Sequence, residues 1–258
     1  MAARPTKILW RMLLAAAILS RVAEAQISVL SSSGAGPQAR SRDELAAAGA
    51  IYEAPDARQV ALAAVRFIQV YPASEFSEYA HVALMHARLE LGNRAGAEQA
   101  GGNALKLAPK NIDALLCLAE ISAERGSSNS SARQTAVEYA SRALQQLQSL
   151  TIPPAARRGA WLRSKKDLLA RAYAILGWLA FEEGRSAEAI EKIRTATGLD
   201  AQGLYFYRLA LVYEGRHEIE PAIDSLEEAQ RIGTAAIQGF AAERLRKLRL
   251  LKAGIPAQ

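Results

Sequence analysis

The chain has 258 residues, a formal net charge of +6 and one cysteine, and 50% of its residues are hydrophobic. This length suffices for one or two domains with a continuous core. The single cysteine excludes an intrachain disulfide, and with three histidines it leaves no zinc-finger spacing. Proline and glycine are infrequent and helix formers dominate between them, so we expect an all-α protein.

The first 25 residues have the pattern of a signal peptide. Three basic residues within 4–11 precede the apolar run 12–19, and the small residues Ala23 and Ala25 follow. Eight apolar residues are too few to cross about 30 Å of hydrocarbon, so we expect cleavage after Ala25 and a periplasmic or secreted protein. Cleavage removes four basic residues and one acidic residue, which lowers the net charge from +6 to +3. That mild charge does not favour a nucleic-acid partner.

Helical segments are predicted to fill the rest of the chain. Residues 26–42 mix Ser, Gly and Pro and have few large apolar side chains, which predicts a flexible linker. From Asp43 onward, apolar residues recur three and four positions apart, with short polar turns between the runs. This rhythm predicts antiparallel helix pairs in series and no strands. The predicted pairs are 43–72, 75–109, 111–149, 154–201 and 203–233, followed by a capping helix 235–252 and a tail 253–258.

Small residues repeat at fixed separations in these pairs. Gly177, Ala189 and Ala196 are separated by twelve and seven positions. Seven residues are about two helical turns, so the last two lie on one face, where a small side chain lets the partner helix cross closely. Three other pairs keep the separation of seven positions, and two of them keep the separation of twelve, although in one of these a methionine takes the first slot. The sets are Met85, Ala97 and Ala104; Ala119, Ala136 and Ala143, where the first separation has grown to seventeen; and Ala210, Ala222 and Ala229.

This pattern resembles the tetratricopeptide repeat, a helix-turn-helix unit of about 34 residues. Ala201 and Thr234 stand where a closing proline is usual, whereas the segment 78–109 keeps it as Pro109. The resemblance implies an α-solenoid in which the first helix of each pair lines a concave face that binds peptides or partner proteins. The segment 170–201 matches best, through Tyr173, Leu176, Gly177, Gly184, Ala189, Ile193, Ala196 and Leu199.

The resemblance also nominates the residues of the concave face. Trp178 and Phe181 are the most suggestive, since aromatic side chains are common interface anchors, although they would equally serve as packing between neighbouring helices. Val82, Asp113 and Leu116 occupy equivalent positions. The expected partner-binding residues are Tyr79, His86, Glu120, Arg171, Trp178, Phe181 and Tyr207.

No motif points to catalysis, a cofactor or a metal. The sequence contains no Gly-rich phosphate loop, no Gly-x-Ser-x-Gly elbow and no His-Glu-x-x-His. His81 and His86 are five positions apart on one predicted helix, which is more than a full turn, so we expect structural or surface histidines. Cys117 lies in the apolar run 115–119, which predicts a buried structural cysteine. We therefore expect a protein that is not an enzyme.

Two functions are compatible with these observations. The first is an exported, bacterial-type scaffold that binds another protein or peptide in its concave groove. The alternative is a module that associates with anionic membrane or polymer surfaces through two basic clusters, within 157–166 and 244–252. The simpler explanation, which assigns the clusters no binding function, is that they are the solvent-exposed faces of amphipathic helices.

Overall fold

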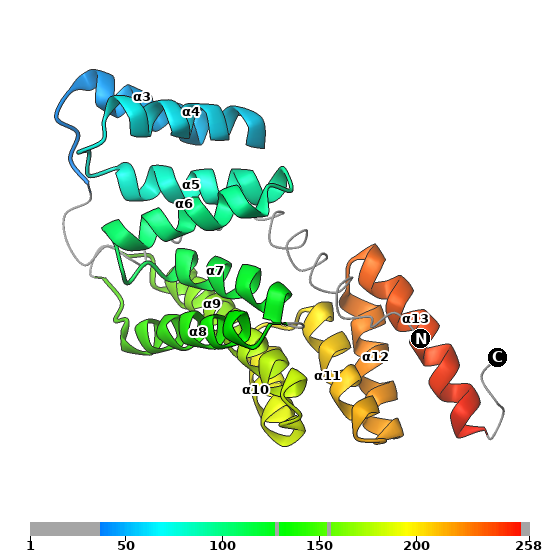
Figure 1. The fold of residues 1–258 in the computed structure, drawn as a ribbon. Coiled ribbons are helices and arrows are strands. Elements are labelled where there is room, and N and C mark those ends of the chain that lie inside the picture. Colours follow the sequence, from blue (N-terminus) through cyan, green and yellow to red (C-terminus); the bar gives the residue numbers. More distant parts are fainter. Residues whose placement is uncertain (1–36, 127–128, 154–155, 254–258) are drawn as a thin grey trace. The chain divides into compact units, whose positions relative to one another are not determined.

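The structure is a computed structural model, and its described residues are 37–126, 129–153 and 156–253. The predicted signal peptide, most of the predicted linker and nearly all of the tail lie outside these ranges. Every regular element among the described residues is a helix (Figure 1), so the predicted all-α class is confirmed. The helices are α3 (Arg42–Glu53), α4 (Ala57–Val70), α5 (Ser77–Glu90), α6 (Arg94–Leu107), α7 (Ile112–Gly126), α8 (Ser130–Ser149), α9 (Arg158–Glu182), α10 (Ser186–Leu199), α11 (Gly203–Gly215), α12 (Ile219–Ile232) and α13 (Ala235–Lys252).

The chain divides into two compact units, residues 1–164 (unit 1) and 165–258 (unit 2). In unit 1 each helix from α3 to α8 contacts the next, and α5 also contacts α3 and α7. In unit 2 the helices α10 to α13 contact one another in series, and α11 also contacts α13. Each unit is thus built from consecutive antiparallel helix pairs, as in a tetratricopeptide-like α-solenoid. Within the described ranges, no helix has the length and apolarity needed to span a membrane.

Several helices begin at a polar residue that caps free backbone N–H groups. The Ser41 hydroxyl accepts a hydrogen bond from the Glu44 N–H at 3.0 Å, at the start of α3. Asp56 and Asn93 do the same for α4 and α6, each at 2.9 Å from a backbone nitrogen three residues later. Such caps each contribute about 1 kcal/mol to stability. The polar turns of the sequence therefore fix where these helices start.

Three pairs share one turn geometry between their two helices. Gly92, Gly184 and His217 have positive φ angles of 74°, 80° and 61°. In each turn the next residue's N–H donates to a carbonyl five residues earlier, over 2.7 to 3.0 Å, which is the Schellman arrangement of a helix end. Glycine adopts this backbone without strain, whereas histidine does not. The turn between α11 and α12 therefore has the same backbone geometry as the other two, with a histidine in place of the glycine that this geometry favours.

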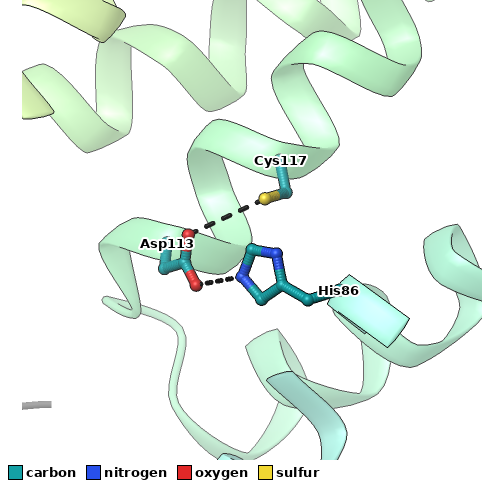
Figure 2. A group of neighbouring side chains, drawn as sticks. All are labelled: His86, Asp113 and Cys117. Atoms are coloured by element: carbon teal, nitrogen blue, oxygen red, sulfur yellow. Dashed lines mark hydrogen bonds and ion pairs between the residues drawn. The ribbon is translucent and has the colours of Figure 1, made fainter. Parts of the chain in front are cut away.

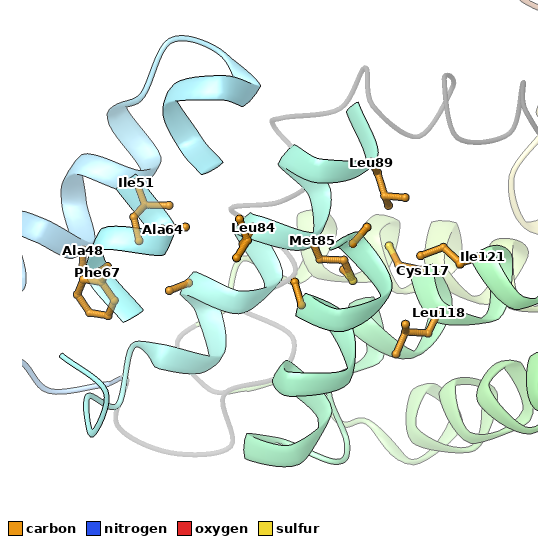
Figure 3. Packing of buried hydrophobic residues seen from close by; sticks show 13 residues of the cluster. Ala48, Ile51, Ala64, Phe67, Leu84, Met85, Leu89, Cys117, Leu118 and Ile121 are labelled. Carbon is orange, nitrogen blue, oxygen red and sulfur yellow. The ribbon is translucent and has the colours of Figure 1, made fainter. Parts of the chain in front are cut away.

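The small side chains of the repeat pattern lie at the helix crossings. The alanines of the last two slots in all four pairs are fully buried, which confirms the predicted close approach. At Gly177 on α9, an added Cβ would lie 2.7 Å from Ile193 Cγ1 and 3.2 Å from the Ala189 carbonyl oxygen on α10. Around these crossings unit 1 builds a core that includes Phe67, Leu84 and Met85 (Figure 3). Side-chain size at the crossing therefore sets the helix spacing.

Replacing Gly177 by valine should destabilise unit 2, because the new side chain overlaps Ile193, which is fully buried. We expect a loss of about 2 kcal/mol, typical of an overfilled core, measured as a lower urea midpoint. Gly239→Val in α13 is the control, since an added Cβ there meets nothing within 4 Å. Equal effects of the two substitutions would contradict the close-approach interpretation.

Replacing His217 by glycine should stabilise the protein. The substitution removes the strain of a non-glycine residue in the left-handed region. Glycine also raises the conformational entropy of the unfolded chain, which offsets part of this gain, so we expect a net stabilisation of about 1 kcal/mol. For a chain of this size, that corresponds to a rise in melting temperature of about 2–4 °C. Gly184→Ala, which creates the same strain in the α9–α10 turn, should lower the melting temperature. A fall for His217→Gly would show that the histidine makes a compensating contact.

Candidate functional site

The first helices of the pairs form a row within each unit. α3, α5 and α7 contact in series in unit 1, and α11 contacts α13 in unit 2. Because a first helix touches the first helix of the next pair, side chains on their outward faces become neighbours although they are about one repeat apart in sequence. We call this surface the first-helix face and examine it in each unit separately.

In unit 1 the predicted face residues differ in exposure. Tyr79, Val82 and His86 on α5 are partly exposed. Burial, and then the neighbouring Glu78 carboxylate, raise the pKa of the Tyr79 phenol. Glu120 on α7 is buried, at 2% exposure. The part of this face open to solvent is therefore provided by α5 more than by α7.

Three side chains from α5 and α7 meet in a small polar group, which we call the His86 group. The ring nitrogen Nε2 of His86 lies 2.5 Å from Oδ2 of Asp113 (Figure 2). The thiol of Cys117 donates to the other carboxylate oxygen, Oδ1, at 3.7 Å. The side chain of His86 is 23% exposed and that of Asp113 is 3% exposed. One side of the group thus reaches solvent through the imidazole, while the carboxylate lies inside.

The spacing of histidines along one helix did not reveal this group. His86 and Cys117 are 31 positions apart in the sequence, and they meet only because α5 packs beside α7. The signal that could have found the pairing is the repeat register: His86 lies near the end of one first helix, and Asp113 lies at the start of the next. Cys117 follows Asp113 by four residues, so both lie on one face of α7.

In unit 2, Trp178 lies in the interior at 1% exposure. Its ring packs against the Phe181 ring, with centroids 5.3 Å apart, and its indole N–H donates to Glu182 at 3.1 Å. The Arg208 guanidinium lies 5.3 Å from the indole centroid in a cation–π contact. Arg171 and Phe181 are partly exposed. Of the two interpretations of Trp178, the structure therefore favours packing between helices.

A second group on the first-helix face joins α11 to α13, and we call it the Tyr207 group. Arg244 donates to the Tyr207 hydroxyl at 3.1 Å and to the Glu214 carboxylate at 2.5 Å. Its guanidinium lies 5.9 Å from the Tyr207 ring centroid, and the Phe240 ring packs beside that ring at 6.3 Å. Tyr207 is buried, whereas Glu214 and Arg244 keep partial exposure. The group therefore places a partly exposed cation, anion and Phe240 ring around the buried Tyr207 ring.

Burial dominates the electrostatics of the Tyr207 group. It raises the pKa of both Tyr207 and Glu214, although the nearby Arg244 acts in the opposite direction on each. Glu214 is only half satisfied, because among the described residues its buried second oxygen, Oε1, has no hydrogen-bond partner. An unpaired buried acceptor costs about 1–3 kcal/mol. The unpaired oxygen therefore lowers the stability of the folded state.

The basic residues of α13 are largely paired with glutamates. Arg244 contacts Glu214, and Lys247 contacts Glu243 on α13 itself. Arg249 and Lys252 reach two glutamates of α12, Glu227 and Glu220, at 2.8 and 2.7 Å. Surface ion pairs contribute little to stability, but they offset the local positive potential. The α13 cluster is therefore less basic than its sequence alone indicates.

Comparisons with known proteins show similarity to solved helical-repeat structures. No protein-family model matches the sequence, and no curated protein matches it. The crystal structure of TTC0263, a thermophilic TPR protein of Thermus thermophilus, has a TM-score of 0.49 and 16% identity, covering 81% of this chain and 98% of that chain.

Two further solved structures show weaker similarity. The crystal structure of MamA protein has a TM-score of 0.40 and 22% identity, covering 61% of this chain and 73% of that chain. The complex of the TPR2AB domain of yeast Sti1 with pHSP90 has a TM-score of 0.30 and 12% identity, covering 80% of this chain and 95% of that chain. At these values the likeness concerns the fold, and no residue role is transferred from these proteins.

Replacing Arg244 by methionine should destabilise unit 2 by about 1–3 kcal/mol at pH 7, because it leaves the half-buried Glu214 carboxylate without its cation. The raised pKa of Glu214 means that the folded state binds this proton more tightly than the unfolded state. Stability therefore recovers as pH falls through the folded-state pKa, and the recovery should be larger in the variant than in the wild type.

Urea denaturation between pH 7 and pH 5 measures this difference. The matched control is the double variant Arg244→Met with Glu214→Gln, in which the buried charge is absent. It should regain part of the lost stability and show no extra pH dependence over this range. If the stability of Arg244→Met changes with pH in parallel with that of the wild type, Glu214 is ruled out as the cause of the destabilisation.

Proposed function

We propose that this protein is a non-enzymatic scaffold that binds a partner protein or peptide along its first-helix face. The observation that carries the proposal is the contact between successive first helices in each unit. These contacts gather side chains from separate repeats into one surface, which a binding partner can contact without any further rearrangement.

The composition of this face suits a polypeptide ligand. Tyr79 and His86 in unit 1, and Phe240 and Arg244 in unit 2, are partly exposed and combine ring faces with hydrogen-bonding groups. Aromatic residues and arginine are enriched among the residues that dominate binding energy at protein interfaces.

Export to the bacterial cell envelope is the second part of the proposal. Its support is the sequence pattern of residues 1–25, with basic residues, a short apolar run and small residues before Ala25. The measurement is the intact mass and fractionation of protein expressed with its own N-terminus. A mass lacking residues 1–25 in the soluble exported fraction supports a periplasmic or secreted scaffold. A full-length mass in the membrane pellet contradicts cleavage.

The alternative, association with an anionic surface, is less well supported. Four basic residues of α13 that would contact such a surface are already in ion pairs with glutamates. A protein or peptide partner can also contact the aromatic rings and hydrogen-bonding groups of the first-helix face, whereas binding to an anionic surface requires only positive charge. We therefore favour polypeptide binding.

Site-specific photo-crosslinking in cells tests the binding face. A photoreactive residue at Tyr79 or Phe240 lies on the first-helix face, while Gln99 on α6 and Asp224 on α12 are exposed controls on second helices. We expect adducts of a common mass from the face positions and none from the controls. Adducts only from the controls, or no adducts from any of the four positions, would overturn the proposed face.

A further inference from the structure

The His86 group contains three different metal-binding donor atoms. The imidazole of His86, the carboxylate of Asp113 and the thiol of Cys117 each offer one atom, and these atoms lie within 4.8 Å of one another. Nitrogen, oxygen and sulfur together form the donor set of borderline divalent ions, of which zinc is the most common in proteins. Hard ions such as Mg²⁺ and Ca²⁺ prefer oxygen ligands only.

The distances within the group are close to those of a metal site. Zinc bonds of about 2.0–2.3 Å in a tetrahedron place ligand atoms about 3.3–3.6 Å apart. The Cys117 Sγ to Asp113 Oδ1 distance is 3.7 Å, and the His86 Nε2 to Asp113 Oδ2 distance is 2.5 Å. These two distances end on different oxygens of the carboxylate, so a single zinc ion needs the distance from Nε2 to Oδ2 to open by about 0.8 Å and the thiol to turn from Oδ1 toward the ion. Side-chain rotation provides such shifts without moving the helices.

We propose that His86, Asp113 and Cys117 bind one divalent metal ion of the zinc type. The ion takes the position of the hydrogen between Nε2 and Oδ2, and that proton is released to solvent together with the thiol proton, because the unprotonated ring nitrogen and the thiolate are the ligands. Three protein ligands leave a fourth position for water or for a donor from a bound partner. The site is independent of whether the first-helix face binds a polypeptide.

The fold holds these ligands in place for this role. Asp113 and Cys117 are four residues apart on α7, so their side chains lie one above the other on the helix. Both are buried, which limits their rotamers, while the partly exposed His86 gives an ion access from solvent. A histidine–aspartate hydrogen bond alone would be a sufficient structural link between α5 and α7. The thiol directed at the same carboxylate is the feature that such a link does not require (Figure 2).

Cobalt(II) absorption with the full chain, freed of metal by a chelator, tests the proposal. We expect one equivalent of Co²⁺ to bind with a thiolate-to-cobalt charge-transfer band and the visible bands of a tetrahedral ion, and Zn²⁺ to displace it. Cys117→Ser should abolish the charge-transfer band. His86→Ala and Asp113→Asn should each weaken Co²⁺ binding by at least about tenfold.

His81→Ala is the matched control, because His81 lies on the same helix but outside the group, and it should leave Co²⁺ binding unchanged. Circular dichroism of each variant without metal establishes that it is folded, and Cys117→Ala provides a second thiol-free variant. Absence of the charge-transfer band in the wild type overturns the proposal. Binding that persists in folded Cys117→Ser and His86→Ala variants also overturns it, since the ion would then lie elsewhere.

Discussion

The close approach of the two helices in each pair is the constraint on which the rest of the structure depends. At each crossing the repeat pattern places a small residue, and the alanines of these slots are fully buried. Gly177 shows the limit, because even one added carbon would overlap Ile193. Since helix spacing follows from side-chain size at the contact, these slots set the distance within a pair. They thereby also set how the first helices of successive pairs meet.

Contact between first helices explains how polar groups form so far apart in sequence. In unit 1 the end of α5 comes beside the start of α7, which places His86 against Asp113. In unit 2 the end of α11 meets α13, which places Glu214 against Arg244. A buried polar group costs less free energy when it is hydrogen-bonded, so each of these contacts also favours one packing of its two helices over others.

The two units present different chemistry on the same kind of face. The His86 group is compact and largely enclosed, and its donor atoms suit a metal ion. The Tyr207 group is larger and aromatic, and it holds a buried carboxylate oxygen without a hydrogen-bond partner among the described residues. A repeat fold permits this divergence because the buried small slots keep the helix spacing within each pair, while the side chains that join successive first helices differ between the units. The backbone is thus reused with different side-chain functions.

The sequence by itself determined the helical class, the small slots and the polar turns between the helices. These features depend on local periodicity and on residues within one pair, for which spacing along the chain reflects spacing in the molecule. Only the tertiary structure decided that Trp178 lies inside, that His86 meets Cys117, and that most α13 cations are paired with glutamates. Such outcomes depend on side-chain contacts between helices that are distant in the chain. The period of a sequence shows which face a residue occupies, whereas the packing of the neighbouring helix decides what that residue touches.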